Sequence, residues 1–110
     1  SVERRPKPQF EWEREESLLT ETRQKVEKPR LYKVLLHNDD YTPMDFVVYI
    51  LRTIFRHTSS EATRIMLHVH QAGVGVAGVF TYEIAEMKVA QVTELAREND
   101  FPLLCTLEEE

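Results

Sequence analysis

An abrupt change in composition at Pro29 constrains this chain more than any other sequence feature. Residues 1–30 hold fifteen charged side chains, eight basic and seven acidic, but only six apolar ones. Residues 31–110 hold forty apolar side chains and carry a net charge of −6. A segment as poor in apolar surface as the first cannot offset the loss of its chain entropy. We therefore predict a flexible charged extension over residues 1–30, with a transient helix over residues 14–26, and one folded domain over residues 31–110.

Size and composition exclude several classes of protein. Eighty residues are enough for one small core but not for a two-domain enzyme. The single cysteine excludes an internal disulfide framework and a cysteine-rich zinc module. No apolar run approaches the roughly 18 residues of a transmembrane helix, and no secretory signal is visible. An acidic domain does not favour nucleic acid as a partner. We therefore expect a cytoplasmic protein that binds neither membranes nor nucleic acids.

The hydrophobic pattern of the domain alternates between the periods of strands and helices. Short β-rich runs predict strands, and apolar residues at helical spacing predict three amphipathic helices. Two glycines in the second strand indicate a bulge or a close approach of another element. The expected order is strand, helix, helix, strand, helix, strand, with the strands at residues 31–36, 74–82 and 103–107 and the last helix at residues 83–97. This order predicts an α+β fold in which a small three-stranded antiparallel sheet packs against three helices.

Capping residues predict where the first two helices begin and end. Thr42 is the expected N-cap of the first helix, with Pro43 in its first turn and Asp45 closing a capping box. Ser59 or Ser60 is the expected N-cap of the second helix, and Gly73 is expected to end it.

Two groups of residues suggest catalytic or metal chemistry, and neither fits it well. His68 and His70 are two residues apart, so on a helix they point about 200° apart and cannot bind one metal ion. We therefore predict no metal site. Cys105, His70 and Asn38 would be the members of a thiol-protease trio. The simpler interpretation is that Cys105 is a buried apolar residue on the same face of the last strand as Leu103 and Leu107.

The turn over residues 38–40, Asn-Asp-Asp, gains interest from what surrounds it. Taken alone it is a solvated turn, and His70 is a histidine at the edge of the core that binds a backbone group. Together, however, these polar groups adjoin two apolar helix faces, which carry Met44, Val47, Met66 and Val69. Nitrogen and oxygen acceptors beside an apolar pocket suit a ligand with an ammonium next to an apolar side chain. The first residue of a peptide is such a ligand.

Four separated stretches resemble the ClpS family, the bacterial N-end rule adaptors of the Clp protease. They are NDDYTPMDFV at residues 38–47, ATRIMLHVH at 62–70, GVFTYEIAEMKVA at 78–90 and PLLCTLE at 102–108. The resemblance covers nearly all of residues 31–110 and implies the α+β fold described above. It also implies an adaptor without catalytic activity or cofactor, expected to be a monomer. Such adaptors bind proteins whose first residue is Leu, Phe, Tyr or Trp, and pass these N-degron substrates to the ATPase ClpA for degradation by ClpP.

The resemblance also implies roles for individual residues. Asn38, Asp39 and His70 would hold the α-amino group of the ligand. The pocket for the first side chain would have Asp40 and Thr42 at its mouth, Met44 as a gatekeeper against β-branched residues, and further walls from Val47, Met66, Val69 and Leu103. The positions that would dock on the N-domain of the ClpA-type AAA+ ATPase are Glu83, Glu86 and Lys88.

Three residues depart from the family pattern, and none lies in the implied amine-binding group. Met87 stands where many members have Thr, Asp45 replaces a common Glu, and Ala77 replaces a common Cys. Met87 adjoins the implied docking positions and is the departure expected to alter partner affinity. Two other functions stay open at this point: a small thiol hydrolase that uses Cys105 and His70, and a general interaction module without a peptide pocket.

Overall fold

The computed structural model describes residues 11–18 and residues 28–110 of the chain. Residues 11–18 form a helix, which includes the first part of the transient helix expected over residues 14–26. The remainder of that prediction, and most of the predicted flexible extension, lies outside the described residues. The boundary between extension and domain therefore stays a prediction.

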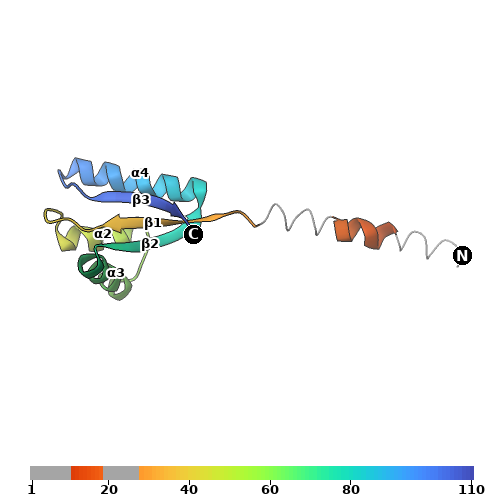
Figure 1. Ribbon diagram of the computed structural model, residues 1–110, viewed down its shortest axis with the longest axis horizontal. Helices are drawn as coiled ribbons and strands as arrows, with labels where there is room; N and C mark the ends of the chain where they lie inside the picture. The colour runs from red at the N-terminus through yellow and green to blue at the C-terminus, as the bar shows by residue number, and fades with distance from the viewer. Residues whose placement is uncertain (1–10, 19–27) are drawn as a thin grey trace, which may run out of the picture.

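A three-stranded antiparallel sheet forms the centre of the domain. Its strands are β1 (Leu31–His37), β2 (Val74–Thr81) and β3 (Leu104–Glu109), and their spatial order is β2-β1-β3. The first strand in sequence is thus the middle strand in space (Figure 1). In its register, Leu36 pairs with Gly75 on one side and with Cys105 on the other.

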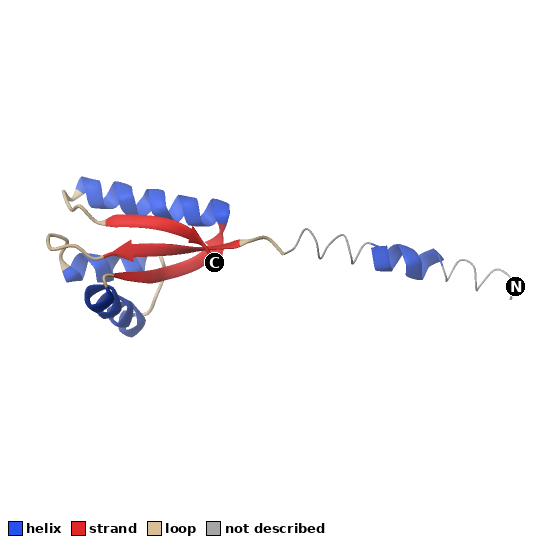
Figure 2. Ribbon diagram, in the orientation of Figure 1, coloured by secondary structure: helices blue, strands red, loops and turns tan. Residues whose placement is uncertain are grey.

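Three helices complete the domain: α2 (Met44–Thr53), α3 (Ser59–Ala72) and α4 (Tyr82–Glu98). The element order and the α+β class are as predicted, and Figure 2 distinguishes the three strands from the helices. Helix α4 contacts all three strands, whereas α3 packs on β2 and on α2. Val34 and Leu36 are buried beneath the helices, but Val76 and Leu104 on the other face of the sheet are exposed. The helices therefore cover one face of the sheet.

The core contains the residues that the hydrophobic periodicity selects. Val34, Leu36, Ile50, Leu51 and Val92 are the largest side chains that are completely buried. Because strands contribute every second residue and helices contribute one stripe, both periods converge on one apolar interior. Cys105 is also buried there, on the face that it shares with Leu103, as expected.

The glycines of β2 allow the close approaches that the sequence predicts. The register of β1 and β2 shifts between Val34 and Leu35, which confirms the expected bulge. A Cβ atom at Gly75 would lie 2.7 Å from Cγ2 of Val69, and one at Gly78 would lie 2.7 Å from the Phe80 ring. Both separations are shorter than van der Waals contact. Gly75 therefore lets α3 lie directly against β2.

The predicted N-cap is wrong by one residue for the first helix and by one or two residues for the second. Pro43, not Thr42, is the N-cap of α2, and no side chain caps this helix, so the capping box expected from Asp45 does not form. The hydroxyl of Thr42 instead donates to Asp39 Oδ2 at 2.7 Å. Helix α3 is capped by Thr58, whose Oγ1 accepts from the backbone N–H of Glu61 at 3.2 Å. Thr58, Ser59 and Ser60 are consecutive, and each has a hydroxyl group that can cap a helix. The sequence pattern alone therefore does not distinguish among them.

Other boundaries differ slightly from the predictions. Helix α4 begins at Tyr82, directly after β2, and ends at Glu98. Strand β3 begins one residue later than expected and continues to Glu109, since its partner β1 extends back to Leu31. Gly73 ends α3 as predicted, with a positive φ of 89°. Such a conformation is accessible to glycine without strain.

Candidate functional site

The turn after β1 is organised by the carboxylate of Asp39. Its Oδ1 accepts hydrogen bonds from the backbone N–H groups of Tyr41 at 2.8 Å and Thr42 at 2.7 Å. Its Oδ2 accepts from the Thr42 hydroxyl at 2.7 Å. Short aspartate side chains stabilise turns by binding the backbone just ahead of them in this way. A carboxylate offers about four acceptor positions, so Oδ2 retains one for a ligand.

The same hydrogen bonds keep Asp39 ionised. Burial of this carboxyl group works against its charged form, but the three hydrogen bonds from Thr42 and Tyr41 outweigh burial, so the pKa of Asp39 lies below its ordinary value. At neutral pH the turn therefore presents a fixed negative charge. This charge suits a cationic ligand rather than an anion.

The C-terminus of α3 lies next to this turn because a backbone hydrogen bond joins them. The N–H of Asn38 donates to the carbonyl oxygen of Gly73 at 2.9 Å. Gly73 in turn donates to Val69 O at 2.9 Å and closes the helix. His70 lies in the last turn of α3, three residues before Gly73. The left-handed Gly73 therefore brings the imidazole of His70 and the amide of Asn38 to the same edge of the domain.

A cavity of about 210 Å³ lies between the turn, α2 and α3. The polar residues at its rim are Asn38, Asp39, Asp40, Thr42 and His70, and the apolar residues around it are Met44, Val47, Met66 and Val69. The structure thus assembles around one space nine of the ten residues that the sequence analysis assigned to ligand binding.

The cavity has an apolar interior and an accessible polar rim. Val47 and Val69 are buried in the core, whereas Met44, the first residue of α2, is 44% exposed at the mouth. Within residues 28–110, the side chains of Asn38 and His70 accept no hydrogen bond from another residue. Both are exposed. Their acceptor atoms are therefore available to a ligand.

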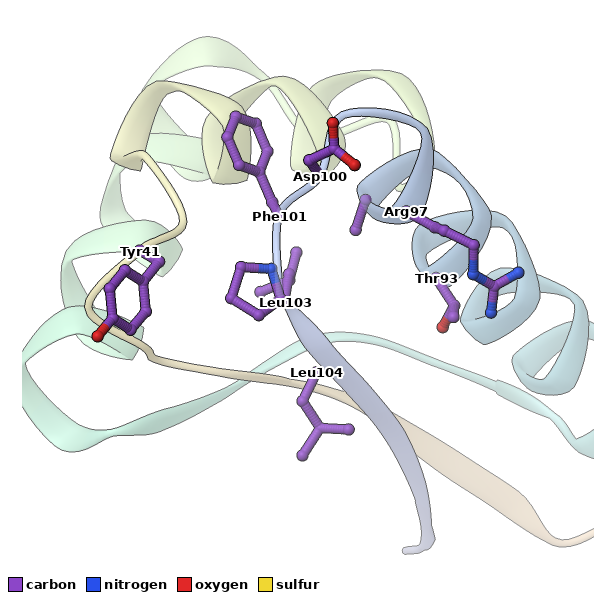
Figure 3. Close-up of a pocket in the computed structure, with 9 residues that line it drawn as sticks. Tyr41, Thr93, Arg97, Asp100, Phe101, Leu103 and Leu104 are labelled. Atoms are coloured by element: carbon purple, nitrogen blue, oxygen red, sulfur yellow. The ribbon is translucent and has the colours of Figure 1, made fainter.

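Leu103, the tenth predicted residue, lies elsewhere. It is buried in the core and lines a separate, larger hollow of about 660 Å³. Figure 3 draws the residues that line this hollow. Leu103 precedes β3, and the side chain of Phe46 on α2 packs against the adjoining Phe101 at 4.7 Å between ring centroids. The segment before β3 thus packs against α2 through this ring contact, which the sequence pattern did not predict.

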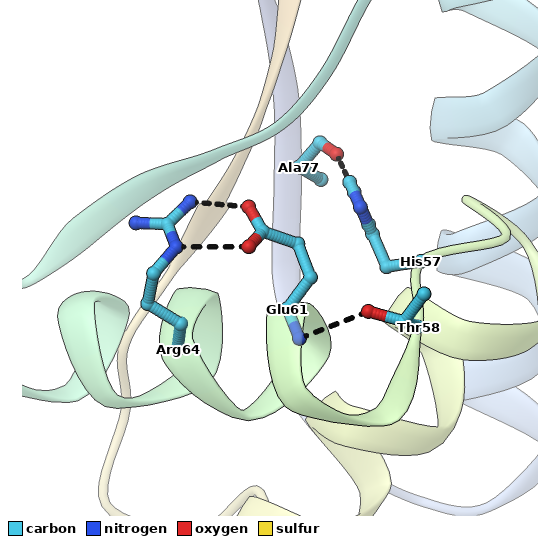
Figure 4. A network of polar contacts seen from close by, with 5 residues as sticks. All are labelled: His57, Thr58, Glu61, Arg64 and Ala77. Atoms are coloured by element: carbon cyan, nitrogen blue, oxygen red, sulfur yellow. Dashed lines mark hydrogen bonds and ion pairs between the residues drawn. The ribbon is translucent and has the colours of Figure 1, made fainter.

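The histidine that binds a backbone group is His57, not His70. Nε2 of His57 lies 2.6 Å from the carbonyl oxygen of Ala77, next to the Thr58 cap and the ion pair between Glu61 and Arg64 (Figure 4). His57 joins the loop before α3 to β2 and so helps to hold α3 in place. Sequence analysis missed this residue, because a single histidine in a short loop carries no pattern.

The features expected of a thiol hydrolase are not present. Cys105 is buried, and burial raises the pKa of its thiol to about 12. A reactive cysteine needs a thiolate at neutral pH, so this thiol is a poor nucleophile. Nor does Cys105 border the cavity that His70 and Asn38 share. Across the described residues, no group of three or more His, Cys, Asp or Glu side chains is placed to hold a metal ion.

The three residues assigned to ATPase docking lie at the start of α4. Glu83 and Glu86 are exposed, and Glu86 accepts a hydrogen bond of 3.0 Å from the Tyr82 hydroxyl. Lys88 is half-buried: its Nζ donates to the carbonyl oxygen of Ile54 at 2.7 Å and lies 5.7 Å from the centroid of the Phe80 ring. Lys88 thus also holds the end of α2, a contact that the sequence pattern does not indicate.

The fold and the cavity define a small binding domain that presents an anionic and amide-lined rim above an apolar space. Comparison with known proteins identifies the particular family. Residues 27–106 match the family described as "ATP-dependent Clp protease adaptor protein ClpS". The chain therefore belongs to the ClpS family of Clp protease adaptors.

Individual relatives agree with this assignment. The chain is 63% identical over 93 residues to the ATP-dependent Clp protease adapter protein ClpS of Hyphomonas neptunium, covering 84% of this chain and 79% of that protein. It is 61% identical over 94 residues to the ClpS of Caulobacter sp. strain K31, covering 86% of each. Among solved structures, Agrobacterium tumefaciens ClpS2 bound to L-phenylalaninamide matches with a TM-score of 0.73 and 43% identity, covering 76% of this chain and all of that one.

A membrane-spanning role finds no support in the described part of the chain. None of the helices there is both long and apolar enough to cross a bilayer.

Proposed function

We propose that this protein is a cytoplasmic adaptor that binds the free α-amino group and the bulky first residue of N-degron substrates, and delivers them to a ClpA-type ATPase for degradation by ClpP. The preferred first residues are Leu, Phe, Tyr and Trp. One observation carries this proposal: three acceptor groups from two separate elements border the same 210 Å³ apolar cavity. The Agrobacterium relative supports it, since the molecule in that structure has a free α-amino group beside an aromatic side chain.

In this proposal, three side chains bind the α-ammonium group. Oδ2 of Asp39 accepts one N–H with its remaining acceptor position, the amide oxygen of Asn38 accepts the second, and a ring nitrogen of His70 accepts the third. His70 accepts only while its imidazole is neutral. Asp39 is suited to a cation because the hydrogen bonds within its turn keep it ionised at neutral pH.

The magnitudes are sufficient for a modest affinity. Hydrogen bonds to charged groups contribute about 1.5–3 kcal/mol each. Burial of a leucine or phenylalanine side chain contributes about 1.5–3 kcal/mol more. Three such bonds and one buried side chain give about 6–12 kcal/mol before the ligand's ordering costs are subtracted, a range that spans the roughly 8 kcal/mol of a micromolar complex. The first residue therefore supplies most of an affinity that is weak enough to allow release.

Selectivity for chain ends follows from the same groups. An internal residue has one amide N–H where a first residue has an ammonium with three donors. Binding an internal residue would bury the rim acceptors without partners, which costs about 1–3 kcal/mol for each group. Met44 at the mouth selects among first residues, because a β-branched side chain is widest where it would pass this methionine.

Delivery to the ATPase involves other parts of the chain. We assign docking to Glu83, Glu86 and Lys88 at the start of α4, where the two glutamates are exposed. The charged residues 1–30 serve as a handle that the ATPase engages during transfer. Deletion of residues 1–25 is then expected to preserve peptide binding but to slow degradation of a bound substrate.

The decisive experiment compares peptides with free and acetylated N-termini. Fluorescence anisotropy would follow binding of the full chain to a peptide that begins with Leu, to the same peptide acetylated, and to one that begins with Gly. Tight binding of the free Leu peptide alone supports the proposal. Equal binding of free and acetylated peptides, or of Leu and Gly peptides, would contradict it and favour a general interaction module.

A further inference from the structure

A hollow of about 660 Å³ adjoins the ligand cavity on the other side of the Asp39–Thr42 turn. Figure 3 shows Tyr41 at one side of this hollow and α4, with Thr93 and Arg97, at the other. Leu103 and Leu104 lie between them. Nothing in the proposed function so far uses this space.

The hollow and the cavity share one turn as their dividing wall. Asp40 and Thr42 line the cavity, whereas Tyr41 between them lines the hollow. A four-residue turn spans less than about 7 Å between its end Cα atoms. An extended peptide advances about 3.4 Å per residue, and its side chains alternate between two sides. The side chain of residue 3 therefore projects to the same side as that of residue 1, about 7 Å further along. In a peptide that crosses the turn, this side chain reaches the hollow.

The surface of the hollow suits an apolar occupant. Tyr41 is 79% exposed and Leu104 is 54% exposed, so both present apolar surface to solvent. Among the described residues that line the hollow, Arg97 is the cationic one and is already paired with Glu94 at 3.1 Å, and Asp100 is the acidic one. An aromatic or large aliphatic side chain would cover this surface without breaking an existing hydrogen bond in this part of the domain.

We propose that this hollow is a second subsite, which holds the side chain of the third residue of a bound N-degron and favours an apolar or aromatic one. The inference rests on the proposed function, because residue 3 reaches the hollow only when residue 1 occupies the cavity. The second residue points away from the protein and is not discriminated. The hollow is open, so the third side chain is only partly buried. We expect roughly a fivefold gain in affinity for Phe over Gly at this position.

A positional scan tests the subsite. The full chain would be titrated against Leu-Gly-Gly-Gly peptides labelled at the C-terminal end, with Phe placed at position 2, 3 or 4, and against the acetylated parent. The expected result is a gain of about fivefold for Phe at position 3 and less than about twofold at positions 2 and 4. Equal affinities across the three positions would overturn the subsite but leave the proposed function intact. Binding of the acetylated parent would overturn the proposed function instead.

A matched pair of variants then places the effect in the hollow. Leu104→Ser removes an exposed leucine that lines the hollow, and Leu67→Ser removes an exposed leucine of α3 that lines neither space. We expect Leu104→Ser to abolish the gain from Phe at position 3 and to bind the Leu-Gly-Gly-Gly parent as the unaltered protein does. Leu67→Ser should retain the gain. Persistence of the gain in Leu104→Ser would refute the assignment, and unchanged binding of the parent peptide shows that the variant is folded.

Discussion

The residues at the two ends of β1 differ in whether those assigned to binding also hold the fold together. At the C-terminal end of β1, Asn38 and His70 border the 210 Å³ cavity, and neither side chain bonds to another residue of the described domain. At its N-terminal end, beside the start of α4, Lys88 is assigned to a partner and also holds the carbonyl of Ile54. Variants at the first end should therefore separate binding from stability, whereas variants at the second should not. Asp39 is the exception at the cavity end, since it does both.

Asp39 should show the largest effect in the molecule. Asp39→Ala removes a charge-assisted acceptor for the ligand, and we expect binding of a Leu peptide to weaken by roughly 10- to 100-fold. It also removes three hydrogen bonds within the turn, so stability should fall by about 0.5–2 kcal/mol. Anisotropy and urea unfolding would measure the two effects. Asp40→Ala is the matched control, because Asp40 lines the cavity but makes no hydrogen bond to another described residue. Equal losses of affinity and stability in both variants would show that Asp39 contributes no more than Asp40 to binding or to the fold.

Lys88 should show the next largest effect, and it tests the other end of β1. Lys88→Met keeps the apolar stem but leaves Ile54 O without its donor, so we expect a loss of about 1–2 kcal/mol in unfolding free energy. Glu83→Gln alters an exposed side chain nearby and should change stability by less than about 0.5 kcal/mol. Both variants should slow ATPase-dependent degradation. If Lys88→Met unfolds at the same urea concentration as the unaltered protein, its bond to Ile54 contributes no stability.

Much of this architecture was predictable, and the exceptions have physical causes. Periodicity found Val47, Ile50 and Val69 because burial repeats along a helix, and Gly73 because a helix end needs a left-handed residue. The contacts of His57 with Ala77 and of Lys88 with Ile54 join residues 20 and 34 positions apart. Such long-range bonds to backbone carbonyls depend on which elements the fold brings together, and single-sequence patterns do not record them.

The residues of the candidate site came from the family resemblance, and few independent placements are needed to bring them to one cavity. Asn38 through Thr42 are consecutive, and Met66, Val69 and His70 share one helix end. These two groups therefore meet once the turn is placed next to the end of α3. The backbone hydrogen bond from Asn38 to Gly73 joins the turn to the end of α3 in this way. Leu103 was the residue placed elsewhere, because its position depends on the path of the loop after α4, where Asp100 adopts a φ of 60°.

Met44 should show a smaller effect, confined to selectivity. Met44→Ala opens the mouth of the cavity, and we expect peptides beginning with Ile or Val to gain about three- to tenfold in affinity. Stability should change by less than about 0.5 kcal/mol because Met44 lies at the solvent-exposed mouth of the cavity and not in the core. Met87→Ala is the control, since Met87 is exposed to a similar extent, 46% against 44%, but lies on α4 away from the cavity. A variant that still rejects Ile and Val would show that Met44 is not the gatekeeper.

The smallest expected effect is the pH dependence that Asp39 confers on stability. Its pKa is lower in the folded protein than in the unfolded chain, because hydrogen bonds from Thr42 and Tyr41 outweigh the cost of burial. The folded state then binds a proton less readily than the unfolded chain does, so the charged carboxylate stabilises the fold at every pH above its ordinary value near 4. This contribution disappears as the pH falls through the lower folded value.

Asp39→Asn isolates that contribution. The difference in urea-unfolding free energy between the unaltered protein and Asp39→Asn should be constant from pH 7 to pH 5 and should shrink as the pH falls below 4. Thr42→Val removes one of the three hydrogen bonds to the carboxylate and should reduce the difference without abolishing it. A difference that grows on acidification would mean that burial, rather than the hydrogen bonds, controls this carboxylate. In that case the turn would hold a neutral acid as the pH falls, and the fixed anion that distinguishes the cavity end of β1 from the α4 end would be lost.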